Sequence, residues 1–198
     1  MEAVSSLVSD AAGRDFFERL RARLRTVPSK TLEAPGLTLK EAAVLAPLFW
    51  RNGEPWTYLT QRPMTLRKHP GQISFPGGGR DASDLTPLHT ALRETREELG
   101  LPVERVDVLG MLGAMPTITS YWVTPFVGVV PAEAPLSPNP GEIAQVLEAP
   151  LWRLRREKRR IYEADRDVYV WDAGRDVVWG ATWRMLHQLL EHVEAVGR

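Results

Sequence analysis

The chain has 198 residues, of which 43% are hydrophobic and 25% charged, and its formal net charge at pH 7 is zero. This composition is typical of a soluble globular protein, and the length fits one domain with a substantial core. The absence of cysteine excludes disulfides, thiolate metal ligands and a cysteine nucleophile, while the balanced charge gives no global reason to expect nucleic acid or a membrane surface as a partner.

The first predicted element is an amphipathic helix over residues 15–24, with Asp15 as its candidate N-cap. Its apolar residues recur at helical spacing, so the helix is expected to lean on the main body of the protein. We therefore expect residues 1–32 to form an N-terminal helical extension and residues 33–198 to form a single domain. Residues 1–14 show no basic flank followed by a long hydrophobic stretch, which predicts no secretion signal and is compatible with cytoplasmic residence.

Strand-forming residues cluster in several segments that are bounded by turn residues. The predicted strands cover residues 42–50, 56–62, 72–75, 106–115, 121–130, 168–171 and 177–179. The first two are expected to form a hairpin around the turn at residues 51–55. Apolar residues at helical spacing predict two longer helices over residues 87–99 and 181–196. Strands that precede, flank and follow isolated helices predict an α+β fold, a mixed α/β sandwich with a central mixed sheet flanked by helices.

The helix predicted at residues 87–99 carries three glutamates. When the helical wheel is centred on Leu92, Glu94, Glu97 and Glu98 fall together on the side opposite the apolar residues. Carboxylate oxygens are hard ligands, and Mg²⁺ is typically held by one or two carboxylates while water and substrate phosphate complete its octahedron. A charged helix face that only contacts solvent is the usual alternative for such a run.

A glycine-rich segment, Phe75-Pro76-Gly77-Gly78-Gly79, precedes this helix and favours the metal hypothesis, because a backbone without Cβ atoms can approach a metal or phosphate. From Gly78 through Asp84 to Arg93-Glu94-Thr95-Arg96-Glu97-Glu98-Leu99-Gly100-Leu101, the chain resembles the signature of the Nudix hydrolases, which has a glycine, a glutamate and R-E-U-x-E-E-x-G-U. Asp84 stands at the glutamate position, one extra residue precedes Arg93, and Thr95 replaces a bulky aliphatic residue.

The segment just upstream narrows the resemblance to the coenzyme A pyrophosphatase branch of that family. The second signature of this branch is leucine-leucine-threonine-x-arginine and a small residue, followed at set intervals by arginine, glycine and F-P-G-G. This chain has the same intervals in Leu59-Thr60-Gln61-Arg62, Arg67, Gly71 and Phe75-Pro76-Gly77-Gly78. Tyr58 replaces the first leucine, and Pro63 replaces the small residue. The resemblance implies a Nudix fold and metal-dependent hydrolysis of coenzyme A or its derivatives to 4′-phosphopantetheine and adenosine 3′,5′-bisphosphate. Another Nudix substrate, such as ADP-ribose, NADH or a dinucleoside polyphosphate, and a non-catalytic binding module with the same fold are the alternatives.

The resemblance also implies roles for individual residues. Glu94 and Glu98 are expected to hold Mg²⁺ or Mn²⁺, with Glu97 as a further or orienting ligand and a backbone carbonyl near Gly78. The expected catalytic residues are Arg93, Glu97, Glu98 and Glu142. Arg93 is expected to be architectural and to fix a neighbouring carboxylate by ion pairing, and Glu97 lies beside it on the helical wheel. Glu142 is the candidate general base from a distant loop, although an ordinary surface carboxylate explains it equally well.

Coenzyme A carries a diphosphate and a separate 3′-phosphate, so its site needs cations beyond the metal. The substrate-binding candidates are Arg62, Arg67, Lys68, Gly77 and Gly78, since arginine gives bidentate phosphate contacts. The basic run at residues 153–160 is a second choice, which a solvated helix face and turn also explain. We expect a small-molecule nucleotide as the partner, with neither nucleic acid nor membrane. The sequence is compatible with a homodimer but does not fix the oligomeric state.

Overall fold

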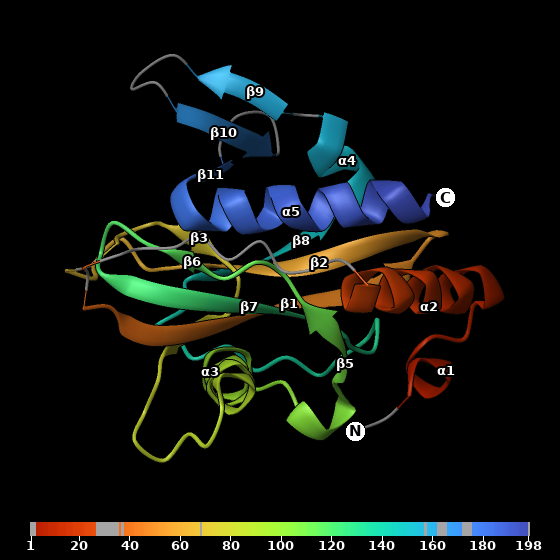
Figure 1. Ribbon diagram of the computed structural model, residues 1–198, viewed down its shortest axis with the longest axis horizontal. Helices are drawn as coiled ribbons and strands as arrows, with labels where there is room; N and C mark the ends of the chain where they lie inside the picture. The colour runs from red at the N-terminus through yellow and green to blue at the C-terminus, as the bar shows by residue number, and fades with distance from the viewer. Residues whose placement is uncertain are drawn as a thin grey trace.

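A central mixed sheet with helices on both faces forms the body of the protein (Figure 1). This computed structural model describes residues 3–26, 36, 38–67, 69–156, 158–161, 166–171 and 176–197, and the side chains of residues 156–176 lie outside the description. The strands of the central sheet are β1 (Lys40–Arg51), β2 (Glu54–Gln61), β3 (Ile73–Ser74), β4 (Gly77–Gly79), β5 (Asp107–Met111), β6 (Met115–Pro116), β7 (Tyr121–Val129) and β8 (Gln145–Pro150).

The long strand β1 organises the sheet. It pairs antiparallel with β2 and with the short strand β4, and parallel with β7, so that the sheet order is β3-β2-β1-β7-β5. Asn52 and Gly53 join β1 to β2 with φ angles of 54° and 77°, the left-handed conformation that the Asn-Gly pair favours in tight hairpins. The predicted hairpin and the predicted fold class are therefore confirmed.

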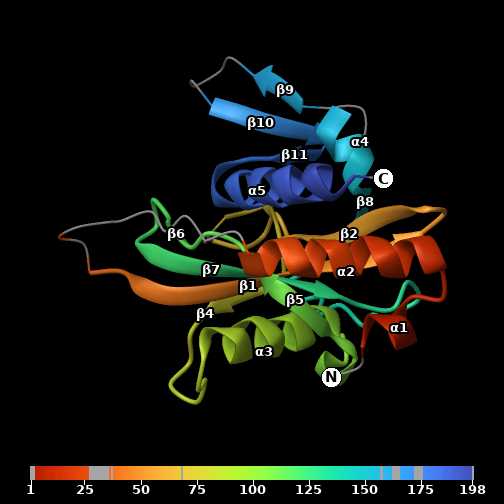
Figure 2. The same ribbon diagram turned by 45° about the vertical axis from the view of Figure 1, so that its right-hand side comes forward.

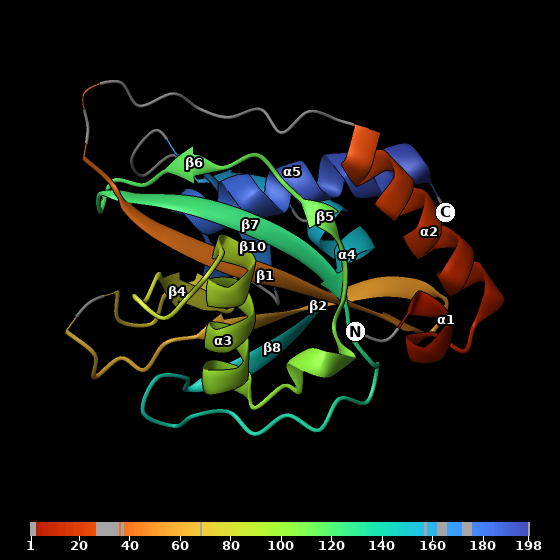
Figure 3. The same ribbon diagram turned by 60° about the horizontal axis from the view of Figure 1, so that its bottom comes forward.

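The two faces of the sheet carry different helices (Figure 2). Helix α2 (Ala11–Thr26) and helix α5 (Gly180–Val196) cover one face and contribute to the larger hydrophobic cluster. Helix α3 (Pro87–Leu99) covers the other face, where it lies against β1 and β4 above a smaller cluster (Figure 3). The catalytic candidates on α3 are thus separated by the sheet from the N- and C-terminal helices.

Helix α2 begins earlier than the sequence predicts, so Asp15 is not its N-cap. Asp10 precedes the helix, and its carboxylate accepts hydrogen bonds from the amides of Ala12 at 2.7 Å and Gly13 at 3.3 Å. A Cβ on Gly13 would lie 2.6 Å from the ring of Trp50. Any larger residue at position 13 would therefore prevent the helix from approaching β1 this closely. The helix leans on the main body as expected, while the predicted boundary at residues 32 and 33 lies outside the described residues.

Other segments differ from the sequence prediction in detail. The strand predicted at residues 106–115 is divided into β5 and β6, and the register of β5 on β7 shifts at Gly110. Strands β4 and β8 were not predicted. A second small sheet contains β9 (Lys158–Ile161), β10 (Arg166–Trp171) and β11 (Asp176–Val178), which confirms the late strand pair.

Three short helical segments complete the described fold. They are α1 (Val4–Leu7), a 3-10 turn (Val103–Arg105) and α4 (Leu151–Arg156). The basic run at residues 153–160 is divided between α4 and β9, and because most of its side chains lie outside the description, its role in phosphate binding stays a prediction. None of the described helices is long and apolar enough to cross a membrane.

Candidate active site

Helix α3 is fixed at both ends by local sequence. The hydroxyl of Thr86 caps the first turn by accepting a hydrogen bond from the amide of His89 at 3.2 Å, and Pro87 occupies the first helical turn. At the other end Gly100 adopts the left-handed conformation with φ of 66°. The helix therefore begins and ends where the sequence predicts, which sets the direction in which its glutamates point.

The glycine strand β4 leaves room for the carboxylates of α3. Gly78 pairs with Ala43 of β1, and a Cβ on Gly78 would lie 2.5 Å from the carboxyl carbon of Glu94. Gly77 has φ of 152°, and a Cβ there would lie 2.4 Å from the carbonyl oxygen of Ala43. Only glycine permits this strand to lie directly against β1 on one side and Glu94 on the other.

Glu98 is buried beside the same strand, with only 3% of its surface exposed. Its carboxylate accepts a hydrogen bond from the amide of Gly77 at 3.1 Å. Burial raises the pKa of Glu98 to about 7, and the nearby charges of Glu94 and Glu142 act in the same direction. The prediction that all three glutamates lie opposite the apolar side of the helix is wrong for Glu98, because β4 supplies both the space and a hydrogen-bond donor on the buried side.

Glu94 is held between the glycine strand and Arg93. Its side chain is 17% exposed, and one carboxylate oxygen lies 2.9 Å from the guanidinium of Arg93. Burial raises the pKa of Glu94, while Arg93 opposes the rise and the charges of Glu97 and Glu142 add to it. Glu94 and Glu98 therefore form a pair of closely placed carboxylates that is costly to ionise without a cation.

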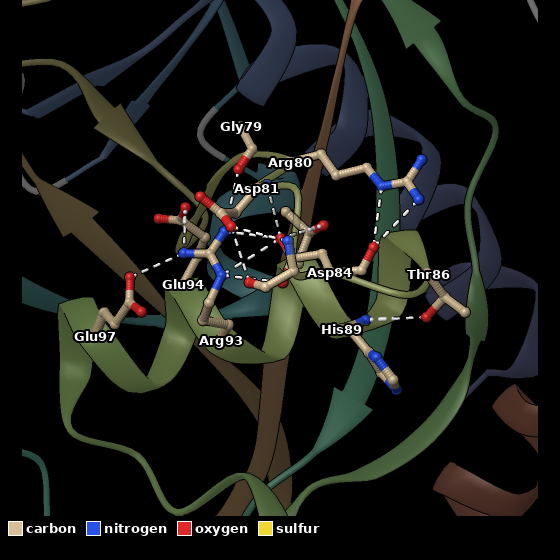
Figure 4. A network of polar contacts seen from close by, with 11 residues as sticks. Gly79, Arg80, Asp81, Asp84, Thr86, His89, Arg93, Glu94 and Glu97 are labelled. Atoms are coloured by element: carbon tan, nitrogen blue, oxygen red, sulfur yellow. Dashed lines mark hydrogen bonds and ion pairs between the residues drawn. The ribbon is translucent and has the colours of Figure 1, made fainter.

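Arg93 connects the helix to the loop between β4 and α3, as Figure 4 shows. Its guanidinium binds the carboxylate of Asp84 through Nε at 3.0 Å and Nη2 at 2.9 Å, and it also donates to the carbonyl of Gly79 at 3.1 Å. The remaining nitrogen, Nη1, contacts Glu97 at 2.9 Å as well as Glu94. The sequence predicted Glu97 as the partner of Arg93 and missed Asp84, which is the principal one.

Asp84 is buried and fully engaged, although it is shorter than the glutamate of the family signature. Besides Arg93, it accepts hydrogen bonds from the hydroxyl of Thr90 at 3.0 Å and the amide of Asp81 at 2.9 Å. The Arg93 guanidinium holds the pKa of Asp84 well below its ordinary value, and the carboxylate in turn raises the pKa of Arg93. The loop thus brings the shorter acid within reach of the arginine.

Glu97 lies on the outer side of this network. Its side chain is 50% exposed and forms an ion pair with Arg93 (Figure 4). Among the residues that the structure describes, no group of three or more acidic or histidine side chains converges closely enough to hold a metal ion. The compact carboxylate pair is therefore Glu94 and Glu98, and a ligand role for Glu97 stays a prediction.

Glu142 comes to this site from a distant part of the sequence. The preceding loop is fastened to the C-terminal end of α3, where the amide of Ser137 donates to the carbonyl of Leu99 at 2.7 Å and the amide of Asn139 donates to that of Glu98 at 2.9 Å. The amide of Glu142 then donates to the carbonyl of Asn139 at 3.0 Å. Glu142 lies close enough to raise the pKa of both α3 carboxylates, so the structure brings this residue and the helix together.

The predicted substrate-binding cations are placed differently from one another. Arg62 follows β2, its amide donates to the carbonyl of Gln72 at 3.0 Å, and its charge lowers the pKa of Glu98. Its Nε is buried and has no hydrogen-bond partner in the described part of the chain. Arg67 is exposed on the loop before β3, whereas Lys68 lies outside the described residues. Only Arg62 is thus shown beside the carboxylates.

The model of the NUDIX domain matches residues 39–171, which include β4, all of α3 and the loop that carries Glu142. This chain belongs to the Nudix hydrolase family. It is 35% identical over 186 residues to the uncharacterized Nudix hydrolase NudL of Photorhabdus laumondii, a match that covers 91% of this chain and 97% of the relative. The NudL protein of Klebsiella pneumoniae is 36% identical over 187 residues, covering 91% and 94% of the two chains.

The fold agrees with that assignment. A MutT/nudix family protein from Enterococcus faecalis has a TM-score of 0.53 and 16% identity, with 93% of this chain and 74% of that one covered. Nudix hydrolases act on pyrophosphate bonds and generally use divalent metal ions. In this Nudix hydrolase the buried pair Glu94 and Glu98, with hard oxygen donors and a glycine backbone beside them, fits such an ion.

Proposed function

We propose that this Nudix hydrolase cleaves the diphosphate bond of coenzyme A or its derivatives, giving 4′-phosphopantetheine and adenosine 3′,5′-bisphosphate. The observation that carries the proposal is the placement of Glu94 and the buried Glu98 beside the glycine strand β4, with Glu142 on the loop that is hydrogen-bonded to the end of α3. Two closely placed carboxylates with raised pKa values are expected at a site that binds cations and moves protons. The coenzyme A motif at residues 58–78 supports the choice of substrate.

Glu94 and Glu98 would hold Mg²⁺ or Mn²⁺, with the backbone carbonyl of Gly78 as a further oxygen donor. Two protein carboxylates suffice when water and phosphate complete the octahedron. Glu97 would join them only after leaving its ion pair with Arg93. When bound, the ion neutralises charge on the phosphate oxygens and lowers the pKa of a water molecule.

Glu142 is the proposed general base, which accepts a proton from the attacking water. A base must lie within hydrogen-bond reach of that water, and the backbone hydrogen bonds from Ser137 and Asn139 to α3, with that from Glu142 to Asn139, keep Glu142 near the end of the helix. Arg93 acts as a positioning residue, because it fixes Glu94 while its own orientation is fixed by Asp84. Arg62, with its unpaired buried Nε, would contact the diphosphate, where negative charge develops.

The loop between β2 and β3 supplies the other candidate cations. Arg67 is exposed and forms no ion pair with any of the described residues, so it can contact an anionic substrate without losing an existing partner. Lys68 stays a prediction from the motif. A substrate-binding role for Gly77 and Gly78 also stays a prediction from the motif, because the space beside their α-carbons is filled by β1 and by the carboxylate of Glu94.

A substrate panel with Mg²⁺ tests this function. We expect release of adenosine 3′,5′-bisphosphate from coenzyme A, at a higher kcat/KM than for ADP-ribose, NADH or dinucleoside polyphosphates. Turnover of ADP-ribose alone would assign the site to another Nudix substrate, and turnover of none would identify a binding module.

A variant series tests the proposed base in the same assay. Glu142→Gln should lower kcat by about 10²- to 10⁴-fold, the usual contribution of a general base. The matched control is Glu133→Gln, an exposed loop carboxylate whose charge acts on Arg51 instead, and it should leave kcat unchanged. A near-normal kcat in Glu142→Gln would remove Glu142 from the mechanism and leave the metal site standing.

A further inference from the structure

An open cavity of about 540 Å³ lies at the end of the sheet, where β1 and β7 begin and β4 ends. Lys40, Glu41, Gly79, Arg80 and Tyr121 contribute to its lining. This volume falls in the range of sites that bind small molecules. The carbonyl of Gly79 accepts a hydrogen bond from Arg93, so the cavity shares a wall with the proposed active site.

Most charged groups around the cavity already have partners, and the carboxylate of Asp81 keeps its negative charge. Arg80 forms an ion pair with Glu41 and donates two hydrogen bonds of 3.2 Å to the carbonyl of Asp84 (Figure 4). Asp81 is bound by the amide and hydroxyl of Ser83 at 2.9 and 2.8 Å. Lys40 is exposed and has no ion-pair partner among the described residues. The ammonium group of Lys40 is therefore the charge that remains available to a ligand.

Tyr121 supplies a flat, firmly held surface in the same cavity. Its ring is half-buried against the larger hydrophobic cluster, and its backbone is fixed by Thr117 through hydrogen bonds of 3.1 and 2.8 Å. Lys40 and Tyr121 are direct partners in the parallel ladder of β1 and β7, so their side chains leave the same face of the sheet. A Cβ on Gly79 would lie 3.6 Å from the ring of Tyr121, which shows that the ring reaches the glycine strand.

We propose that this cavity binds the 3′-phosphorylated nucleoside of the substrate, with the ring of Tyr121 against the base and the ammonium group of Lys40 on the 3′-phosphate. An aromatic ring offers a π-face to a base, and an unpaired lysine is a point charge that suits a phosphate. The diphosphate would then lie beside Gly78 and Glu94, on the α3 side of the sheet, so the substrate would pass around strand β4. The assignment rests on the proposed function and gives the 3′-phosphate to Lys40 instead of Arg67.

Two measurements test the proposal, and the first does not depend on activity. Isothermal titration of adenosine 3′,5′-bisphosphate into the full chain with EDTA should show binding that weakens about tenfold or more in Lys40→Met, as expected when a charged hydrogen bond is lost. Tyr121→Ala should weaken it as well. The matched control is Arg25→Met, an exposed cation in the last turn of α2, which should bind as the wild type does. Absence of binding by the wild type would overturn the proposal.

The second measurement compares kcat/KM for coenzyme A and for 3′-dephospho-coenzyme A. The wild type should prefer coenzyme A, and Lys40→Met should lose that preference through KM, with dephospho-coenzyme A hydrolysed within about twofold of the wild-type rate. Loss of the preference in Arg67→Ala but not in Lys40→Met would overturn the assignment. If the wild type does not hydrolyse coenzyme A but binds the bisphosphate through Lys40, the proposed function fails while the cavity assignment stands.

Discussion

Glu98→Gln should stabilise the metal-free protein above pH 7 while it abolishes hydrolysis. The folded chain raises the pKa of Glu98 from its ordinary value of 4.5 to about 7, chiefly through burial. The folded state then binds more protons than the unfolded state between these two values, so the free energy of unfolding falls as the pH rises through this window. Above about pH 7 the full cost of the buried charge is present.

The magnitude follows from the same two pKa values. Their difference corresponds to about 3 kcal/mol, an upper figure because water can reach a carboxylate as the site relaxes. Glutamine keeps the acceptor for the amide of Gly77 and removes the charge, so we expect a gain of roughly 1–3 kcal/mol at pH 8 and little or none at pH 4.5. For a chain of this length, each kcal/mol corresponds to about 2–4 °C in Tm.

The assay is urea unfolding followed by tryptophan fluorescence in the presence of EDTA, at pH 8 and at pH 4.5. Glu97→Gln is the matched control, because its half-exposed side chain should show no such gain that depends on pH. Addition of Mg²⁺ at pH 8 should stabilise the wild type more than Glu98→Gln, since the ion offsets the buried charge. If Glu98→Gln is less stable than the wild type at pH 8, or if its gain does not change with pH, the account of Glu98 as an uncompensated buried carboxylate is refuted.

Two further substitutions test the surroundings of this pair. Gly78→Ala places a Cβ 2.5 Å from the carboxyl carbon of Glu94, so it should displace that carboxylate and lower kcat/KM by about 100-fold or more, measured together with the circular dichroism spectrum to show that the fold persists. Asp84→Asn leaves Arg93 without its main partner and should reduce the free energy of unfolding at pH 7 by about 2 kcal/mol, measured in urea. The pKa of Asp84 is lowered in the folded chain, so the stabilisation by its ion pair with Arg93 is present above the ordinary pKa of the carboxyl group and is lost as the pH falls toward the folded value. An Asp84→Asn defect that persists unchanged in strong acid would contradict the ion-pair explanation.

Local sequence was sufficient to predict the helices and turns whose ends are set by capping or turn-forming residues. Helix α3 begins at the Thr86 cap and ends at Gly100, and the β1–β2 hairpin turns at Asn52 and Gly53, as expected for these residue types. The fold class followed from the order of such elements. Strand β8 was missed because its sequence, Gln145–Pro150, contains few strand-forming residues, and its pairing with β2 makes it a strand.

The arrangement of the site depends on contacts that no periodicity reveals. A helical wheel placed Glu98 with Glu94 and Glu97 opposite the apolar residues, because the wheel contains no information about the space beside Gly77. Likewise, Asp84 became the partner of Arg93 through the path of a loop, and Glu142 approaches α3 through backbone hydrogen bonds from Ser137 and Asn139. The sequence supplied the candidates for the site, whereas the tertiary structure determines which of them carry an uncompensated charge.

The distribution of donors on Arg93 explains why that charge is left on Glu98. A guanidinium has five N–H donors, and in this chain they serve Asp84 twice, Gly79, Glu94 and Glu97. Because the buried carboxylate of Asp84 fixes the plane of the guanidinium, Arg93 cannot turn to Glu98 without breaking its strongest contact. Glu98 has no ion pair within the described residues, so a cation from solvent is the group that can neutralise it. The arginine thus orders the helix and, by being saturated, does not supply the charge that Glu98 lacks, which supports the metal site proposed there.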